Sequence, residues 1–139
     1  MIVVDTSAIL AYMNAADRHH ASVSAWLDPE DEELATTPLI LAEADHLAGA
    51  RGGPAAQGAL RADLAAGAYL VDWWPGAIIA TVNVAEQYAD TGLGLADASL
   101  VALAERLGTI SIATLDERHF RAVRPLAGGD AFRLLPQDL

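Results

Sequence analysis

The chain contains neither cysteine nor lysine, and these two absences exclude several kinds of site. Without cysteine there are no disulfide bonds and no thiolate ligands for a metal ion. Without lysine, all eight positively charged residues are arginines, whose planar guanidinium groups keep their charge and match the geometry of phosphate oxygens. A hydrolytic site in this chain would therefore use neither a thiolate nor a lysine amine as its nucleophile.

Long apolar runs are also missing from the sequence. The longest uncharged run covers residues 73–85 and contains Pro75, so it is too short to cross a bilayer. The amino-terminal residues Met1–Asp5 lack the basic region and the apolar core of a signal peptide. We therefore expect a cytoplasmic protein with no membrane-spanning segment.

Positive charge is scarce as well. The sequence has 19 acidic residues and 8 basic ones, which gives a formal net charge of −11. Proteins that bind nucleic acid through a broad basic surface have the opposite balance, so the composition argues against this mode of binding. The many carboxylates must instead be solvated, paired with arginine or bound to metal ions.

Strand and helix patterns alternate along the 139 residues, with no repeat and no linker that would divide the chain. Apolar runs indicate buried strands, and Thr37-Pro38 and Gly52-Gly53-Pro54 mark helix boundaries. The predicted strands are 2–5, 34–36, 69–72, 110–114 and 131–135, and the predicted helices are 8–15, 18–27, 38–50, 54–66, 75–89 and 96–107. This order predicts one domain, 1–139, of the α/β class: a three-layer α/β/α sandwich around a mainly parallel sheet of about five strands.

Four acidic residues are predicted to lie at one edge of this sheet. Asp5 ends the first strand, and Asp116 follows the strand at 110–114. Asp97 begins the helix that leads into that strand, and Glu43 lies in the second turn of the helix that starts at Pro38. In parallel α/β sheets, strand ends and the following helix starts meet at the carboxyl edge, where ligands bind. We therefore expect these carboxylates to converge there.

The predicted helix faces point to a metal ion as the partner of these acids. Glu43 shares its face with Ile40, Ala44 and Leu47, and Asp97 shares its face with apolar residues of its own helix. An isolated carboxylate on an inward face is costly unless a cation or a proton neutralises it, and no arginine lies on these faces. Oxygen ligands favour Mg²⁺ or Mn²⁺.

Each acid also has a simpler explanation when it is taken alone. Asp5 is suited to cap the first helix, Asp97 to interact with a helix dipole, and Asp116 to form a turn. Glu43 fits an exposed helix position. The expected location of all four at the same edge favours a shared site over four separate explanations.

These motifs resemble those of PIN-domain ribonucleases, and among them the VapC-type toxins of bacterial toxin–antitoxin pairs. The matching segments are V-V-D5-T-S-A, L-A-E43-A, L-A-D97-A-S-L-V-A-L-A and A-T114-L-D116-E-R-H-F. The resemblance implies an Mg²⁺- or Mn²⁺-dependent endoribonuclease with Asp5, Glu43, Asp97 and Asp116 in the catalytic and metal site, Glu43 acting directly or through water. It also implies supporting roles for Thr114 and Thr6, a tRNA or rRNA substrate, a VapB-type antitoxin partner and a homodimer.

Two further groups near Asp116 remain open in the sequence. His119 is close enough to touch substrate, although a packing role is favoured. Arg118, Arg121 and Arg124 recur at three-residue spacing, and this basic cluster suits either RNA phosphate contact, chiefly by Arg118 and Arg121, or salt bridges to neighbouring acids.

Other functions fit the sequence less well. A haloacid-dehalogenase-type phosphatase needs D-x-D after the first strand, where this chain has Ser7, and a receiver domain needs a lysine that is missing. A catalytically silent PIN domain acting as a binding or regulatory module is the main alternative, and a DNA-directed nuclease of the same superfamily is another. The net charge favours the silent module, whereas the intact set of acids favours hydrolysis by metal-activated water.

Overall fold

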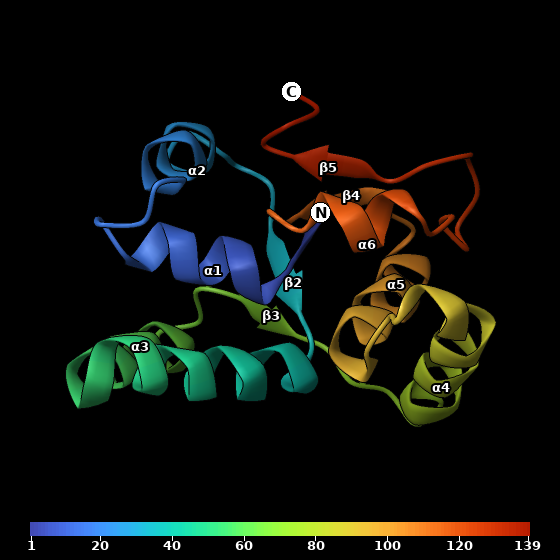
Figure 1. The fold of residues 1–139 in the computed structure, drawn as a ribbon, viewed down its shortest axis with the longest axis horizontal. Coiled ribbons are helices and arrows are strands. Elements are labelled where there is room, and N and C mark those ends of the chain that lie inside the picture. Colours follow the sequence, from blue (N-terminus) through green and yellow to red (C-terminus); the bar gives the residue numbers. More distant parts are fainter.

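The computed structural model describes residues 1–139 and contains one five-stranded sheet flanked by helices (Figure 1). The strands are β1 Ile2–Val4, β2 Leu34–Thr36, β3 Leu70–Val71, β4 Ser111–Ala113 and β5 Arg133–Leu135, in the order β3-β2-β1-β4-β5. Every neighbouring pair is parallel. The predicted sheet is confirmed, including its last strand at the edge. The strand order reverses between β1 and β4, which is where ligands bind in open parallel sheets.

Helices connect the strands and cover both faces of the sheet. They are α1 Thr6–Met13, α2 His20–Leu27, α3 Pro38–Ala65, α4 Ala77–Gln87, the 3-10 helix η1 Ala89–Thr91, α5 Leu95–Leu107 and α6 Glu117–Arg121. In Figure 1, α1, α2 and α3 lie on one side of the strands, and α4, α5 and α6 lie on the other. The predicted three-layer α/β/α arrangement is therefore confirmed.

Helix α3 consists of two helical arms that fold back on each other at Gly53. Thr37 caps the first arm by accepting a hydrogen bond from the Ile40 amide at 3.3 Å. Gly53 has φ +70° and ψ −167°, which breaks the helix. The Arg61 Nε then lies 2.7 Å from the Asp45 Oδ1, although 16 residues of straight helix would span about 24 Å. The reversal confirms the break predicted at Gly52-Gly53-Pro54.

The core is centred on β1, β4 and α5. All residues of β1 are buried, and α5 has an unbroken buried run from Ala98 to Ala104. This run is explained by the position of α5, which packs against α4, α3 and β1. None of the helices combines the length and the apolar character that crossing a bilayer would require. The starts of α3 and α5 are joined by a buried 2.7 Å hydrogen bond between the hydroxyls of Thr37 and Ser99.

The conformation of Gly53 predicts a position-specific effect of alanine. A side chain at this φ and ψ is strained, so Gly53→Ala should lower the free energy of unfolding by about 1–3 kcal/mol. Gly58→Ala is the matched control because Gly58 lies inside the second arm, at an ordinary helical φ, with open space around its Cα. That change should raise the free energy of unfolding by about 0.5–1 kcal/mol. Urea unfolding midpoints measure both changes in the free energy of unfolding. Changes of the same sign in the two variants would contradict the reversal of α3 at Gly53.

Candidate metal centre

The four predicted acids line one cleft of about 360 Å³ at the carboxyl edge of the sheet. Asp5 directly follows β1, and its amide donates a 2.9 Å hydrogen bond to the Ala113 carbonyl at the end of β4. Glu43 comes from the first arm of α3, Asp97 from the first turn of α5, and Asp116 from the residue before α6. The remaining lining residues are Thr6, Ser7, Leu10, Leu47, Arg51, Gly94, Leu95 and Ala96.

Asp5 is the most buried of the four acids, with only 3% of its surface exposed. Its Oδ2 accepts hydrogen bonds from the Ser7 Oγ and from the Thr114 Oγ1, each at 2.8 Å. Burial raises the pKa of Asp5, while the hydrogen bonds from Thr114 and Ser7 act in the opposite direction. Asp5 occupies the position before α1 but makes no side-chain capping bond to it, so helix capping does not explain this residue.

The two hydroxyls that hold Asp5 are themselves fixed by backbone amides. The Leu115 amide donates to the Ser7 Oγ at 2.9 Å, and the Asp116 amide donates to the Thr114 Oγ1 at 3.0 Å. Because each hydroxyl oxygen accepts one of these bonds, its own proton is directed to the Asp5 carboxylate. The predicted support by Thr114 thus has a structural basis, and it ties Asp5 to the segment that carries Asp116.

The structure assigns the other supporting hydroxyl to Ser7 instead of Thr6. The Thr6 Oγ1 faces the Ile40 carbonyl at 3.5 Å, so the predicted support of Asp5 by the Thr6 side chain is wrong. Thr6 is the first residue of α1, and its side chain turns toward α3. Ser7, one residue further around the helix, points back to Asp5. The motif D-T-S contains both hydroxyls, and only the helix orientation distinguishes them.

Glu43 lies in the cleft, but it is not on an inward face as predicted. Ile40 and Ala44 of the same helix are buried, whereas Glu43 is exposed. Glu43 sits at the border of the apolar stripe, and it lines the cleft. Asp5 and Asp97 are therefore the acids whose burial favours a nearby cation, whereas Glu43 is solvated without one.

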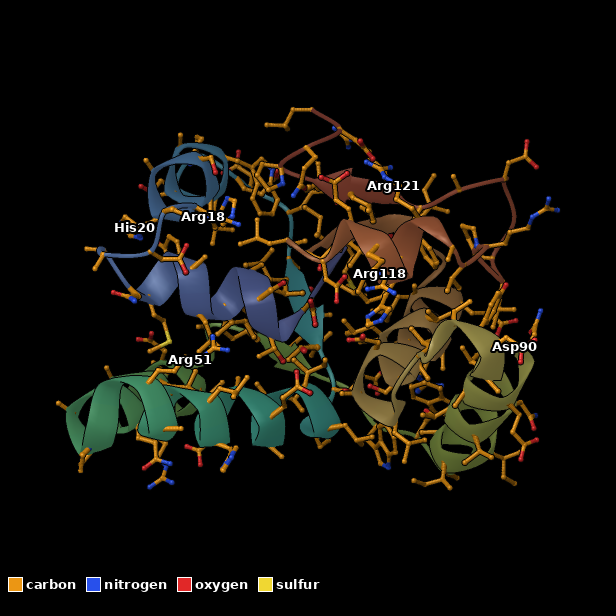
Figure 2. The ribbon with its side chains drawn as sticks, viewed as in Figure 1. Arg18, His20, Arg51, Asp90, Arg118 and Arg121 are labelled. Carbon is orange, nitrogen blue, oxygen red and sulfur yellow. The ribbon has the colours of Figure 1, made fainter.

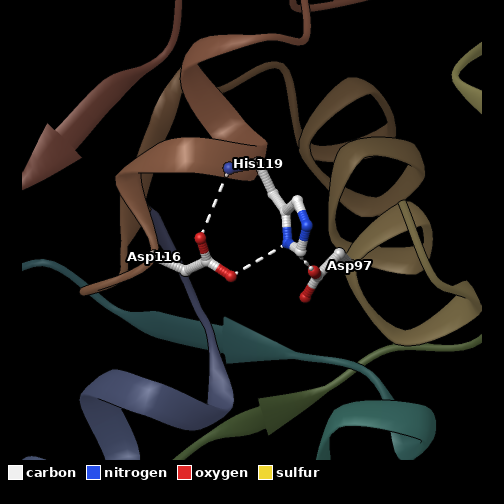
Figure 3. Close-up of side chains that lie close together, drawn as sticks. All are labelled: Asp97, Asp116 and His119. Atoms are coloured by element: carbon white, nitrogen blue, oxygen red, sulfur yellow. Dashed lines mark hydrogen bonds and ion pairs between the residues drawn. The ribbon is translucent and has the colours of Figure 1, made fainter. Parts of the chain in front are cut away.

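Asp97 and Asp116 both approach the Nδ1 atom of His119 (Figure 3). The His119 Nδ1 lies 2.9 Å from the Asp116 Oδ2 and 3.3 Å from the Asp97 Oδ2. The other oxygen of Asp116, Oδ1, accepts a 3.3 Å hydrogen bond from the His119 amide and so caps α6. One ligand atom from each of these three residues lies within 4.8 Å of the others, which is close enough for a shared metal ion.

His119 contacts two of the cleft acids, so the packing role that the sequence favours for it is not its whole role. Its spacing of three residues after Asp116 was the available signal. A residue that precedes a helix and the third residue within that helix are neighbours in space. The imidazole brings a positive charge between two carboxylates when it is protonated, and a nitrogen ligand when it is neutral.

The crowding of carboxylates changes the protonation of Asp97. Burial and, after it, the neighbouring charges of Asp5 and Asp116 together raise the pKa of Asp97 to about 7, although His119 acts in the opposite direction. A raised pKa means that the surroundings of the carboxyl group disfavour its charged form, because too little positive charge lies nearby. A divalent cation would supply that charge, and oxygen-rich ligands suit Mg²⁺ or Mn²⁺. The residues therefore fit a metal ion.

The predicted arginine cluster does not form one basic face. Arg121 is held by Asp138 at 2.6 and 2.7 Å and by Glu117 at 3.3 Å, and Arg124 falls beyond the end of the five-residue α6. Of the two roles predicted for this cluster, Arg121 therefore has that of a salt-bridge partner. Arg118 is exposed and has no acidic partner within 4 Å.

A family model for the PIN domain matches residues 2–125 of this sequence. The chain belongs to the PIN domain family. Ribonuclease VapC26 of Mycobacterium tuberculosis is 40% identical over 136 residues, which cover 97% of this chain and 100% of the relative. The similarity thus extends over nearly the whole chain.

Two solved structures share this PIN fold at lower sequence identity. The crystal structure of Mycobacterium tuberculosis VapC20, a toxin that cleaves the sarcin–ricin loop, superposes with a TM-score of 0.77 at 21% identity, covering 84% of this chain and 90% of that one. FitAcB from Neisseria gonorrhoeae superposes with a TM-score of 0.62 at 22% identity, covering 86% and 91%. At this level of sequence identity, both structures show that the fold is shared and nothing more.

The raised pKa of Asp97 predicts how the metal-free protein responds to pH. The pKa rises from 3.8 in the unfolded chain to about 7, so the Asp97 contribution to stability falls as pH increases from 4 to 7 and stays low above that. Asp97→Asn removes this penalty. The variant should exceed wild type by about 1–2 kcal/mol at pH 8, a value reduced for partial exposure, and should match it near pH 4.

Thermal midpoints in the presence of a chelator, measured between pH 4 and pH 8, test this expectation. Asp90→Asn is the control, because Asp90 is an exposed acid of η1 far from the cleft (Figure 2). Its pH profile should parallel that of wild type. A parallel profile for Asp97→Asn as well would contradict the electrostatic description of the cleft.

Proposed function

We propose that this PIN domain is a divalent-metal-dependent endoribonuclease of the VapC type, the toxin of a toxin–antitoxin pair. The observation that carries the proposal is the convergence of Asp5, Glu43, Asp97 and Asp116 on one cleft at the reversal of strand order. The 40% identity to Ribonuclease VapC26 over nearly the whole chain supports ribonuclease activity within the family. The same four acids are the proposed catalytic and metal-binding residues.

Asp97 and Asp116 are the proposed direct metal ligands, with Asp5 and Glu43 completing the site directly or through water. When bound, Mg²⁺ or Mn²⁺ would activate a water molecule and neutralise charge on the phosphate. The chain's own residues bind and orient. Ser7 and Thr114 fix one oxygen of Asp5, and the His119 amide fixes one oxygen of Asp116, which restrains both side chains at the cleft.

The products follow from the chemistry of phosphodiester hydrolysis. Water adds to phosphorus, the bond to the 3′-oxygen breaks in line with the attack, and the departing oxygen takes up a proton. No covalent enzyme intermediate is required, in agreement with the absence of cysteine and lysine. The cation also changes the local sign of charge, so an acidic cleft in a protein of net charge −11 can accept an anionic strand.

A VapB-type antitoxin and a second copy of the chain are the proposed protein partners. Both proposals come from the membership of the PIN domain family and the resemblance to VapC-type toxins. A transfer RNA or a ribosomal RNA is the proposed substrate. A catalytically silent module remains the competing function, and it differs from the enzyme in one measurable respect, which is the fate of RNA in the presence of metal.

Metal binding should stabilise the fold in a way that depends on the cleft acids. Addition of MgCl₂ or MnCl₂ at about 100 times the dissociation constant should raise the free energy of unfolding by about 2.7 kcal/mol. Asp116→Asn should lose most of this stabilisation, while Asp90→Asn should keep it. The gain should also be smaller at pH 5.5 than at pH 8, because protons compete with the cation for Asp97. Thermal midpoints and direct titration calorimetry measure these effects, and equal gains for both variants would place the metal elsewhere.

RNA cleavage tests the proposed activity itself. Wild-type protein with Mg²⁺ or Mn²⁺ should cleave RNA in a total RNA preparation, and a chelator should stop the reaction. Asp97→Asn should reduce the rate by at least about 100-fold, by loss of charge stabilisation at the phosphate. Equal cleavage by both proteins would indicate a contaminating nuclease. A folded, metal-bound wild type that leaves both tRNA and rRNA intact would favour the silent module.

A further inference from the structure

Most of the acidic surface has no arginine to pair with, yet several arginines have no acidic partner. Three of the eight arginines form salt bridges: Arg61 with Asp45, Arg106 with Asp72, and Arg121 with Glu117 and Asp138. Among the others, Arg51 is distinguished by its position, because it lines the same cleft as the four acids. An exposed cation beside so many carboxylates that pairs with none of them is available for an anion from outside.

Arg51 lies on the face of α3 that borders the cleft. Glu43, Leu47 and Arg51 follow at four-residue spacing, so they share one side of the first helical arm, and all three line the cleft. Eight residues of helix place Arg51 roughly 12 Å along the axis from Glu43. Figure 2 shows Arg51 between α1 and α3. The guanidinium is therefore at the end of the cleft, away from the proposed metal ligands.

The cleft does not close at Arg51. A second hollow of about 300 Å³ begins there, and it shares Leu10, Leu47 and Arg51 with the first. The two hollows together form a groove between α1 and α3, with the acids at one end and Arg51 at the junction. A strand whose reacting phosphate lies at the acids would thus meet Arg51 where the two hollows adjoin.

We propose that Arg51 binds a nearby backbone phosphate of the RNA substrate other than the phosphate that is cleaved. This inference rests on the proposed nuclease function, since it places the reacting phosphate at the acids. Arginine suits the task because its planar fork makes two charge-assisted hydrogen bonds to phosphate oxygens. The contact reads the backbone and not the base, so it positions the strand without selecting a sequence. Arg118, on α6, is the corresponding unpaired cation of the neighbouring element.

A purely structural role for Arg51 makes a different prediction. The residue stands in the last turn of the first arm, two residues before the break at Gly53, where a positive charge stabilises the helix dipole. That role would affect stability and leave RNA binding unchanged. Measurements of stability and of RNA binding on the same variant therefore separate the two roles.

The test measures binding of a labelled single-stranded RNA oligonucleotide in MgCl₂ by proteins that all carry Asp97→Asn to suppress cleavage. Arg51→Gln should weaken binding about tenfold, the loss of one charge-assisted contact. It should also reduce the slope of log affinity against log salt concentration by about 0.7, the value for one phosphate on a single strand. The loss should be similar for oligonucleotides of different sequence.

Arg133→Gln is the matched control. Arg133 is exposed and forms no salt bridge. It lies opposite Ser111 in the β4–β5 register, at the amino end of β5 and so at the sheet edge opposite the cleft. The Arg133→Gln substitution removes the same charge as Arg51→Gln, so an effect of net charge alone would be equal in both variants. Arg51→Lys should retain most of the salt slope and lose part of the affinity. Thermal midpoints verify that every variant is folded.

Each outcome decides the proposal. Equal binding by the Arg51→Gln and Arg133→Gln proteins would overturn it. Unchanged RNA binding with weaker binding of a glutamate-rich peptide probe would assign Arg51 to a protein carboxylate, which would also overturn it. The nuclease proposal fails separately. If wild type leaves RNA intact while Arg51→Gln selectively weakens RNA binding, the contact stands and the catalytic function does not.

Discussion

The 2.8 Å hydrogen bond from the Thr114 hydroxyl to the Asp5 carboxylate joins the two halves of the molecule at the reversal of strand order. Asp5 directly follows β1, which leads into β2 and β3 on one side of the sheet, and Thr114 directly follows β4, which leads into β5 on the other side. The bond connects residues 109 positions apart and is closed to solvent. A buried carboxylate is tolerated only when donors surround it, so the packing of this edge must keep Thr114 and Ser7 in place. The remaining acids assemble around that fixed point.

The sequence allowed the fold and the location of the acids to be predicted because both depend on local signals. Apolar runs, the Thr37-Pro38 start and the Gly53 break set the elements, and in a parallel sheet the ends of strands and the starts of helices share one edge. The direction of individual side chains was less accessible. Whether Thr6 or Ser7 faces Asp5 depends on how α1 packs on α3, and the exposure of Glu43 depends on how far the cleft opens. His119 was misjudged because its importance arises from Asp97, which a different element contributes.

The arginines of this molecule fall into two groups, those held in ion pairs and those that form none. Asp45 and Asp138 hold arginines in ion pairs that fasten the α3 hairpin and the carboxyl-terminal segment. Such exposed pairs contribute little to stability individually, but each one removes an arginine from contact with other anions. Arg51, which lines the cleft, and Arg118, two residues after Asp116 on α6, form no such ion pair. An overall acidic chain can therefore approach a nucleic acid through a few placed cations and a metal ion, where a general positive surface is lacking.

The cleft acids place stability and metal binding in opposition. Asp5, Asp97 and Asp116 raise one another's free energy when they are charged together, as the elevated pKa of Asp97 indicates. Replacing Asp97 should make the metal-free fold more stable, so the presence of this acid is not explained by the needs of folding. A divalent cation reverses this balance, because the same repulsion that penalises the empty cleft becomes attraction for the ion. The strained electrostatics of the metal-free protein and the affinity for metal are thus two consequences of one arrangement, and a variant that improves the first should weaken the second.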